Sequence, residues 1–266
     1  MTYSLISNIT ITIMRIHKSP RTFQTSESKN YSEKVIEDFG IEWQKYRFIE
    51  GQATETLDQQ FLAYFSTIKL NSFDPKSSVA ADIGAGSGRW SERIIEYFSF
   101  LYVLEPSKGA YSVLQEKFSN NPKVKLLQEK IGSDSIPQNS LDLAFSLGVL
   151  HHLPDTKLAL KDICKRIKPG GFLVCYLYYD LENKSNIYRL IFQLVNLTRK
   201  FISRLPIKIK IFITKLIALF IYFPFAKFSK LLSKLKIDNS GIPLHHYANM
   251  PFLVMANDSL DRFGTT

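Results

Sequence analysis

Residues 79–90 read VAADIGAGSGRW, and this stretch decides the fold. Its first five residues are apolar except for Asp82 and predict a short buried strand. Glycine then recurs at alternate positions, and the following SERIIEYFSF has the spacing of a helix opened by serine. The stretch therefore predicts a strand, a glycine turn and a helix in direct succession.

The same alternation continues along the chain to about residue 180. Further strands are predicted at FLYVLE, VKLLQE, LDLAFSLG and FLVCYLYY, the last after a KPGG turn, and helices at KGAYSVLQEKF and DTKLALKDICKRI. Strands that alternate with helices imply βαβ units, so we predict an α/β fold with a Rossmann-like, doubly wound, mostly parallel sheet and helices on both faces. The ligand of such a sheet is expected at the carboxyl ends of the strands.

Changes in composition divide the chain into five predicted segments. They are a flexible lead-in at 1–30, cap helices at 31–72, the α/β core at 73–182, a basic amphipathic helical insertion at 183–237 and a C-terminal segment at 238–266. The cap contains Leu57, Phe61, Leu62, Phe65 and Ile68 at helical spacing. The lead-in has neither a basic start nor a continuous apolar run, so we expect no cleavable signal.

The glycine turn is suited to close contact with a ligand. Gly84, Gly86 and Gly88 allow a tight turn and leave room for a ligand to approach the backbone. A dinucleotide-binding turn needs G-x-G-x-x-G, but its last position is Arg89 here. A nicotinamide oxidoreductase is therefore a distant alternative.

The pattern D-x-G-x-G-x-G from Asp82 to Gly88 resembles motif I of class I S-adenosylmethionine-dependent methyltransferases. SLGVLHHLPD at 146–155 is similar to the corresponding stretch of the group that includes the ubiquinone and menaquinone biosynthesis methyltransferases. The resemblance covers residues 79–180 in consecutive order, and FGIEW at 39–43 extends it. It implies an enzyme that transfers a methyl group from S-adenosylmethionine to a small-molecule acceptor, without a metal ion.

The resemblance also implies a set of cofactor-binding residues: Asp82, Gly84, Ala85, Gly86, Gly88, Glu105, Pro106, Asp134, Leu147 and Gly148. Asp82 would hold the methionine amino group. Glu105 lies 17 residues past Gly88, close to the roughly 20-residue offset expected of a ribose-binding acid. Asp134 would meet the adenine amino group with Ile136 over the ring, although a surface-turn aspartate is the alternative interpretation.

Two adjacent histidines are expected at the lip where the acceptor would approach. A neutral imidazole titrates in the range that suits a general base. Because adjacent side chains cannot both point inward, His152 is the catalytic candidate and one of His151 and His152 is expected to be structural. His245 and His246 are further candidates for proton removal.

The two cysteines, Cys164 and Cys175, have no partner at a metal-ligand spacing. We predict that both are core residues, with no zinc site and no disulfide. This usage fits a reducing compartment, so a cytoplasmic protein is expected. The sequence does not indicate an oligomeric state.

Residues 183–237 contain twelve Lys or Arg and no Asp or Glu, against a net charge of +10 for the whole chain. Such basic amphipathic helices favour a lipophilic acceptor and peripheral contact with the inner face of a membrane. The alternative is a substrate cap packed on the core, and RNA binding is disfavoured because bulky aliphatic residues interrupt the charges. LIALFIYFPFA at 216–226 is shorter than the roughly 18 to 20 residues of a membrane span, so none is predicted.

The resembling fold ends in a helix and an antiparallel strand pair after the fifth strand. After residue 237 only one further strand is predicted, around PFLVM at 251–255. The sheet would then have an exposed edge that invites pairing with another chain. We therefore expect 238–266 to be truncated relative to the resembling family, and a second function stays open, that of a noncatalytic relative that binds the cofactor or a membrane and has lost turnover through this truncation.

Overall fold

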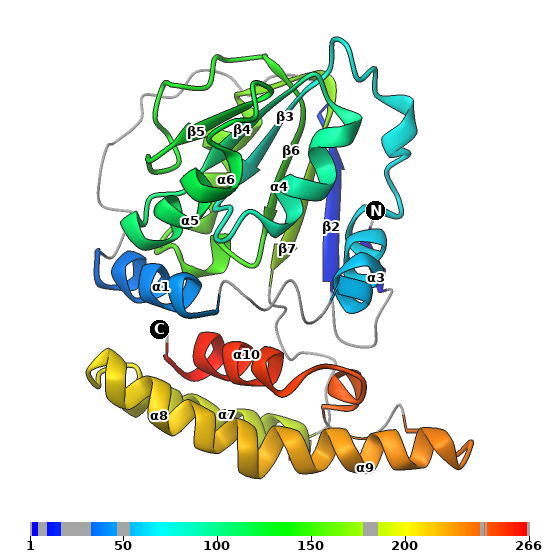
Figure 1. Cartoon of the computed structure of the whole chain (residues 1–266), viewed down its shortest axis with the longest axis vertical. Helices are drawn as coiled ribbons and strands as arrows, with labels where there is room; N and C mark the ends of the chain where they lie inside the picture. Colours follow the sequence, from blue (N-terminus) through cyan, green and yellow to red (C-terminus); the bar gives the residue numbers. More distant parts are fainter. Residues whose placement is uncertain are drawn as a thin grey trace. The chain divides into compact units, whose positions relative to one another are not determined.

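The computed structural model describes residues 2–4, 10–16, 33–46, 54–177, 186–239, 242 and 244–264. The chain divides into two compact units. The first comprises residues 1–47 and 59–179, and the second comprises residues 48–58 and 180–266. The first unit is an α/β domain, whereas the described part of the second is helical (Figure 1).

The elements up to residue 177 include two amino-terminal strands that were not predicted, and from residue 79 onward they alternate as the sequence predicts. They are β1 (Thr2–Ser4), β2 (Thr10–Arg15), α1 (Glu33–Tyr46), α3 (Thr54–Phe65), η1 (Leu70–Ser72), β3 (Val79–Ile83), α4 (Arg89–Ile94), η2 (Ile95–Tyr97), β4 (Phe100–Leu104), α5 (Lys108–Phe118), β5 (Val124–Leu127), β6 (Leu141–Leu147), η3 (Leu150–His152), α6 (Thr156–Cys164) and β7 (Ile167–Leu177).

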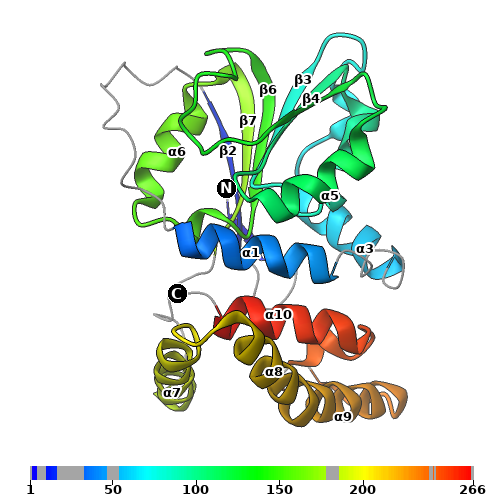
Figure 2. The same ribbon diagram turned by 60° about the vertical axis from the view of Figure 1, so that its left-hand side comes forward.

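The strands form one seven-stranded sheet in the order β1-β2-β7-β6-β3-β4-β5. Strands β3 to β7 pair in parallel, and β1 and β2 add an antiparallel pair at one edge. Figure 2 shows α6 on one side of the sheet and α5 on the other. Because both faces are covered, the parallel strands are mostly apolar, as FLYVL and, apart from Asp82, VAADI are. The predicted Rossmann-like fold is confirmed.

The amino-terminal segment departs from the sequence prediction. Strand β2 pairs with β7 from Thr10, opposite Leu177, to Arg15, opposite Phe172. The prediction of a flexible lead-in is therefore wrong for these residues, whose β-branched side chains favour a strand; residues 17–30 lie outside the described part of the chain. An antiparallel strand pair thus flanks β7, and the amino terminus supplies it.

Local signals account for the helix bounds in the core. The Ser107 side chain caps α5 by accepting from Ala110 N–H, and Asp155 caps α6 by accepting from Leu158 N–H. Helix α4 is shorter than predicted, because the chain tightens into a 3₁₀ turn after Ile94. Strand β7 already begins at Ile167, so the residues predicted as the KPGG turn lie within it.

The core of the first unit lies between the sheet and its helices. Phe65 of α3 packs edge-on against Phe145 of β6, with ring centroids 5.4 Å apart. Of the predicted apolar stripe on α3, Phe61 and Phe65 are buried, but Leu62 is 66% exposed and does not belong to it. Cys175 is buried in the core cluster, whereas Cys164 is partly buried, and both carry free thiols.

The second unit contains α7 (Asn186–Ile202), α8 (Ile207–Ile217), a π-helical turn η4 (Ala218–Tyr222), α9 (Phe223–Lys234), η5 (His245–Tyr247) and α10 (Phe252–Gly264). The strand predicted around PFLVM is wrong, because these residues open α10. Buried Met255, Ser259 and Phe263 recur at helical spacing along it.

Helices α8, η4 and α9 run on as one 28-residue helix, Ile207–Lys234. By length and composition it is the one described helix that could cross a membrane. The charge-free stretch 216–226, from which no span was predicted, covers only part of this helix, which continues through Lys215 on one side and Lys227 on the other and also includes Pro224. Proline has no N–H to donate and displaces the carbonyl one turn before it, and the preceding turn is the wider π-helix.

Candidate cofactor site and active site

The candidate site lies at the carboxyl edge of the parallel strands. Strands β3, β4, β5 and β6 end at Ile83, Leu104, Leu127 and Leu147. Because the strands are parallel and neighbouring, the loops that follow them lie at one edge of the sheet. The structure thus brings together the glycine loop, the Glu105 loop and the Gly148 loop, as the sequence predicts.

The glycine loop needs glycine for two reasons. Gly84, Gly86 and Gly88 have φ angles of 77°, 56° and 74°, in the left-handed region that side chains rarely adopt. A Cβ on Gly84 would lie 2.6 Å from Val149 Cγ1, and one on Gly86 would lie 2.6 Å from the Trp43 ring. The glycines therefore serve packing within the protein as well as the ligand approach that the sequence suggests.

Glu105 is fixed by the backbone at the point predicted for a ribose-binding acid. Its Oε2 accepts from Gly86 N–H at 2.9 Å and its Oε1 accepts from Ser107 N–H at 2.9 Å. The side chain is 6% exposed. This carboxylate therefore joins the loops after β3 and β4, a role that spacing alone does not reveal.

Asp82, the residue before the last of β3, is buried beside the same loops. Ser91 of α4 donates its hydroxyl to Asp82 Oδ2 at 2.6 Å. Ser91 was not predicted as a partner of Asp82, because in the sequence this residue indicates only the start of a helix. The bond holds the carboxylate of β3 against the helix that follows the glycine loop.

Burial dominates the ionisation of both acids. It raises the pKa of Asp82 to about 7, with Glu105 adding to the rise and the Ser91 hydrogen bond opposing it. Burial also raises the pKa of Glu105 to about 7, against the two backbone hydrogen bonds. Two acids that change charge near neutral pH are therefore adjacent in the site.

We expect the free energy of unfolding of the ligand-free chain to fall as the pH rises from about 5 to about 8. In this range the folded chain retains protons on Asp82 and Glu105 that the unfolded chain has already lost, so folding binds protons. Urea unfolding across this range measures the slope. The double variant Asp82→Asn/Glu105→Gln should flatten it, and a wild-type stability that rises with pH would contradict the assignment.

Asp134 and Ile136, the two residues predicted to contact the adenine, do not lie together at the site. The Asp134 side chain is fully exposed and its Oδ1 lies 3.6 Å from Arg166 Nη2. Ile136 is 2% exposed and belongs to the core cluster. The structure therefore does not bury Asp134 with the other predicted site residues, and Ile136 packs in the interior.

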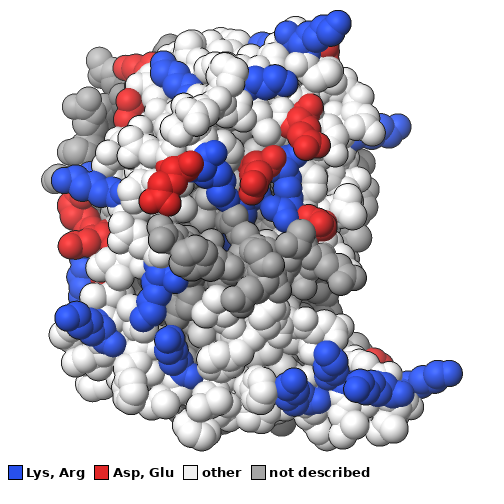
Figure 3. All heavy atoms as spheres, in the orientation of Figure 1, with Lys and Arg blue, Asp and Glu red and all other residues white. Residues whose placement is uncertain are grey.

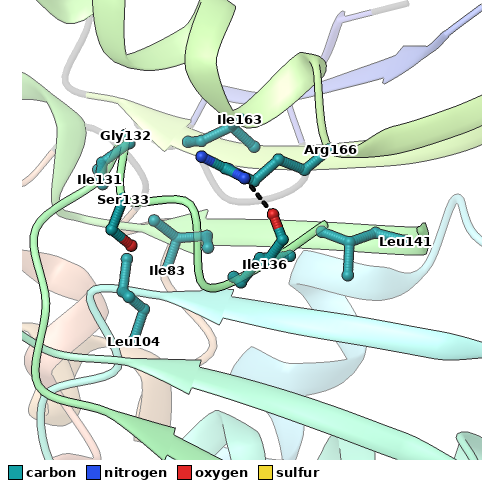
Figure 4. A pocket seen from close by; sticks show the side chains of 9 residues that line it. All are labelled: Ile83, Leu104, Ile131, Gly132, Ser133, Ile136, Leu141, Ile163 and Arg166. Atoms are coloured by element: carbon teal, nitrogen blue, oxygen red, sulfur yellow. Dashed lines mark hydrogen bonds between the residues drawn. The ribbon is translucent and has the colours of Figure 1, made fainter. Parts of the chain in front are cut away.

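Figure 4 shows a small pocket beside these residues, beneath the ends of β3 and β4. Ile83, Leu104, Ile131 and Ile136 give it apolar walls, and Ser133 and Arg166 contribute polar atoms. The Arg166 guanidinium donates to the Ile136 carbonyl oxygen and so fixes the loop after β5. Its lining also includes Ile163 of α6 and Leu141, the first residue of β6, so the pocket extends from the carboxyl ends of β3 and β4 along the sheet beside α6.

Glu129 is a site candidate that the sequence analysis missed. It lies two residues after β5, and Ser135 donates to its Oε1 at 2.6 Å while Ser133 donates to its Oε2. The serine hydrogen bonds, that from Ser133 first, lower its pKa. A carboxylate held in its ionised form thus follows β5 much as Glu105 follows β4, and that shared position after a strand was the available signal.

The candidate base His152 lies in the 3₁₀ turn after β6. Its ring centroid is 4.1 Å from that of His151 and 4.8 Å from that of Phe39 of α1 in an edge-on arrangement. Gly148, at the start of this loop, has φ 78° and donates its N–H to Tyr176 O at 3.1 Å. Phe39 of α1 thus contacts the loop after β6. Trp43 of the same helix lies against Gly86 in the loop after β3.

The remaining histidine candidates lie in the second unit. His245 Nδ1 is 3.1 Å from Ile242 O, and the side chain of His246 lies outside the described residues. Within the described residues, no three His, Cys, Asp or Glu side chains cluster as metal ligands.

The fold and this edge of the sheet define a Rossmann-like domain with a glycine loop and a carboxylate on the next strand. Residues 81–175 match the family described as methyltransferase domain. The chain is 27% identical over 111 residues to a methyltransferase of Claviceps purpurea, covering 40% of this chain and 35% of that protein. It is 26% identical over 104 residues to demethylmenaquinone methyltransferase of Bacillus licheniformis (38% and 45%).

A third relative, tRNA U34 carboxymethyltransferase of Ruthia magnifica, is 30% identical over 126 residues, covering 42% of this chain and 36% of that protein. The chain thus spans between a third and a half of the length of these three relatives. Residues 81–175 form a class I methyltransferase domain, and the methyl donor of this class is S-adenosylmethionine.

Proposed function

We propose that this chain binds S-adenosylmethionine at the loops after β3 and β4 and transfers its methyl group to a small, lipophilic acceptor. The observation that carries the proposal is the Glu105 carboxylate, which the N–H groups of Gly86 and Ser107 hold at the carboxyl edge of the sheet. A buried acceptor at this point can receive both ribose hydroxyls of the cofactor. Asp82 would then receive the methionine amino group.

The residues of this edge fit the cofactor. The glycines of the loop carry no side chains that would keep a ligand from the backbone, and the space that their Cβ atoms would take is filled by Val149 and the Trp43 ring. The sulfonium carries a methyl group already activated for displacement, so the protein has to align the acceptor and exclude water. Phe39 and Trp43 supply apolar surface beside these loops, and His152 would take a proton from an oxygen or nitrogen acceptor.

Glu129 is proposed as the adenine-side carboxylate in place of Asp134. We expect Glu129→Gln to weaken S-adenosylmethionine binding by about tenfold, because a charge-assisted hydrogen bond contributes about 1.5–3 kcal/mol. Asp134→Asn, which alters an exposed side chain of the same loop, serves as the matched control and should bind as the wild type does. Equal losses in both variants, or a loss in Asp134→Asn alone, would return the role to Asp134.

The lipophilic acceptor is supported by one relative and by the composition of the second unit. One relative is named demethylmenaquinone methyltransferase, and the substrate in that name is lipophilic. Another is named for tRNA, but the basic residues at 183–237 alternate with exposed Phe, Leu and Ile side chains rather than forming a solvated phosphate-binding face. We therefore favour a lipid-soluble acceptor over RNA.

The test is transfer of a labelled methyl group from S-adenosylmethionine to a total lipid extract and, separately, to total RNA, with Glu105→Gln as the inactive control. Label that partitions into the organic phase with the wild type alone supports the proposal. Label in RNA would overturn the acceptor class. Cofactor binding without transfer to either extract would favour the noncatalytic relative.

A further inference from the structure

The long helix Ile207–Lys234 has the reverse of the pattern expected for a helix on a water-soluble protein. Its buried positions recur every three or four residues and are mostly small or polar; they include Thr214, Ala218, Tyr222, Ala226 and Ser229. A helix that packs against a core in water would place its bulky apolar side chains on this face. Here only Ile211 and Tyr222 among the bulky apolar side chains are buried, and most of the others are exposed.

The opposite stripe of the helix is apolar and exposed. It carries Phe212, Leu216, Phe220, Phe228 and Leu231, with exposed fractions from 38% at Leu216 to 70% at Phe220. Only 33% of the most apolar 18-residue window is buried, whereas the core helix of a soluble protein is mostly buried. The second unit therefore presents a continuous apolar surface to its surroundings.

Hydrogen bonds join the buried face of this helix to other segments of the same unit, and one lies within the helix itself. Ser259 of α10 donates to the Thr214 carbonyl oxygen at 3.0 Å, and the Thr214 hydroxyl donates to the Lys210 carbonyl oxygen at 2.8 Å. Asn239 donates to Ser229 Oγ at 2.7 Å. Small and polar residues between helices, with apolar residues outward, are the arrangement of helices that pack in lipid.

The charges beside this surface select the kind of partner. Lys208 and Lys215 precede the charge-free stretch 216–226, and Lys227, Lys230 and Lys234 follow it, with no Asp or Glu anywhere in 183–237. In Figure 3 the Lys and Arg side chains gather over α9 beside a broad uncharged surface. A second copy of the chain seated on this face would bring like charges together, whereas an anionic lipid headgroup layer complements them.

We propose that the exposed face of Ile207–Lys234 docks the protein in the plane of an anionic lipid bilayer, such as the cytoplasmic leaflet of a membrane. The charge-free stretch of eleven residues would span about 16 Å along a helix, about half of a hydrocarbon core of roughly 30 Å. The helix therefore lies along the interface with its Phe and Leu side chains inserted, and its lysines reach the headgroups. This inference deepens the proposed function, because it places the enzyme where a lipophilic acceptor is dissolved.

The test is flotation of the full-length chain with vesicles of phosphatidylcholine alone or with about one third phosphatidylglycerol. We expect the wild type to float with the anionic vesicles and to be released by salt. The variant Phe212→Ser/Phe220→Ser/Phe228→Ser changes only exposed side chains and should lower binding by at least about tenfold. Lys227→Gln/Lys230→Gln/Lys234→Gln should lower it several-fold.

The matched control is Lys76→Gln/Lys123→Gln/Lys157→Gln, which removes the same charge from exposed positions of the first unit and should float as the wild type does. A wild type that stays with the aqueous fraction, or a triple phenylalanine variant that floats as well as the wild type, overturns the proposal. A dimer that the phenylalanine variant dissociates, without flotation, assigns the face to a second copy instead.

A spectroscopic probe fixes the depth of the contact. The chain has two tryptophans, Trp43 and Trp90, both in the first unit. The variant Phe220→Trp adds a third tryptophan on the exposed face of the helix. On vesicle binding, the emission of this tryptophan should shift to the blue, and brominated acyl chains should quench it. An emission that these chains do not quench would contradict insertion. These measurements need no cofactor, so their failure beside intact S-adenosylmethionine binding would refute the docking and leave the proposed function standing.

Discussion

Glu105→Gln is expected to weaken S-adenosylmethionine binding about 100-fold while the chain stays folded. The wild-type carboxylate would accept from two ribose hydroxyls, and each such charge-assisted hydrogen bond contributes about 1.5–3 kcal/mol. Glutamine has nearly the same size, but its amide NH₂ group is a donor where the carboxylate oxygen was an acceptor. This group must therefore face either a backbone N–H, which is also a donor, or the ribose hydroxyls. Calorimetric titration measures the affinity, and circular dichroism checks the fold.

Glu96→Gln is the matched control for this variant, because it makes the same chemical change at an exposed position of η2. It should bind the cofactor with wild-type affinity. If Glu105→Gln also binds as tightly as the wild type, Glu105 serves only to join the loops after β3 and β4, and the ribose contact must be made elsewhere.

Gly86→Ala is expected to lower the free energy of unfolding by about 3 kcal/mol. A side chain at φ 56° costs about 1–2 kcal/mol, and the added Cβ would lie 2.6 Å from the Trp43 ring, an overpacking that costs about 1–3 kcal/mol. Urea unfolding gives the loss. Cofactor binding should weaken as well, because the Gly86 N–H orients Glu105.

Two further variants separate the two causes. Gly170→Ala places a side chain at φ 91° with nothing within 4 Å of the new Cβ, so it reports the backbone cost alone. In the background of Trp43→Ala, the additional cost of Gly86→Ala should disappear. A Gly86→Ala loss equal to that of Gly170→Ala would show that Trp43 yields without strain and that α1 is not held against the glycine loop.

The sequence predicts the parallel core well because its strands are buried on both faces. VAADI, FLYVL and LDLAFSL read as apolar runs, and the glycines, Ser107 and Asp155 mark where helices begin. Spacing alone located Glu105 at the edge of the sheet. It could not reveal that Gly86 and Ser107 hold the carboxylate or that Ser91 binds Asp82, because those contacts depend on how the loops pack.

The flanking segments were harder to predict for identifiable reasons. Strand β2 pairs at the sheet edge with a strand more than 150 residues away in sequence, and its polar surroundings read as a linker. The five-residue apolar run PFLVM fits a strand or a helix, and only the burial of Ser259 and Phe263 beyond it identifies α10. The charge-free stretch 216–226 is bounded by Lys215 and Lys227, but the helix runs through both lysines, so its length could not be read from that stretch.

The most direct test of the central claim is calorimetric titration of the purified wild-type chain with S-adenosylmethionine and S-adenosylhomocysteine, at a pH above about 7 where Glu105 is ionised. The account predicts saturable binding of both ligands at one site, with affinity that falls as the pH is lowered through about 7. A folded chain that binds neither ligand across this range would contradict the assignment of the glycine loop and Glu105 as a cofactor site.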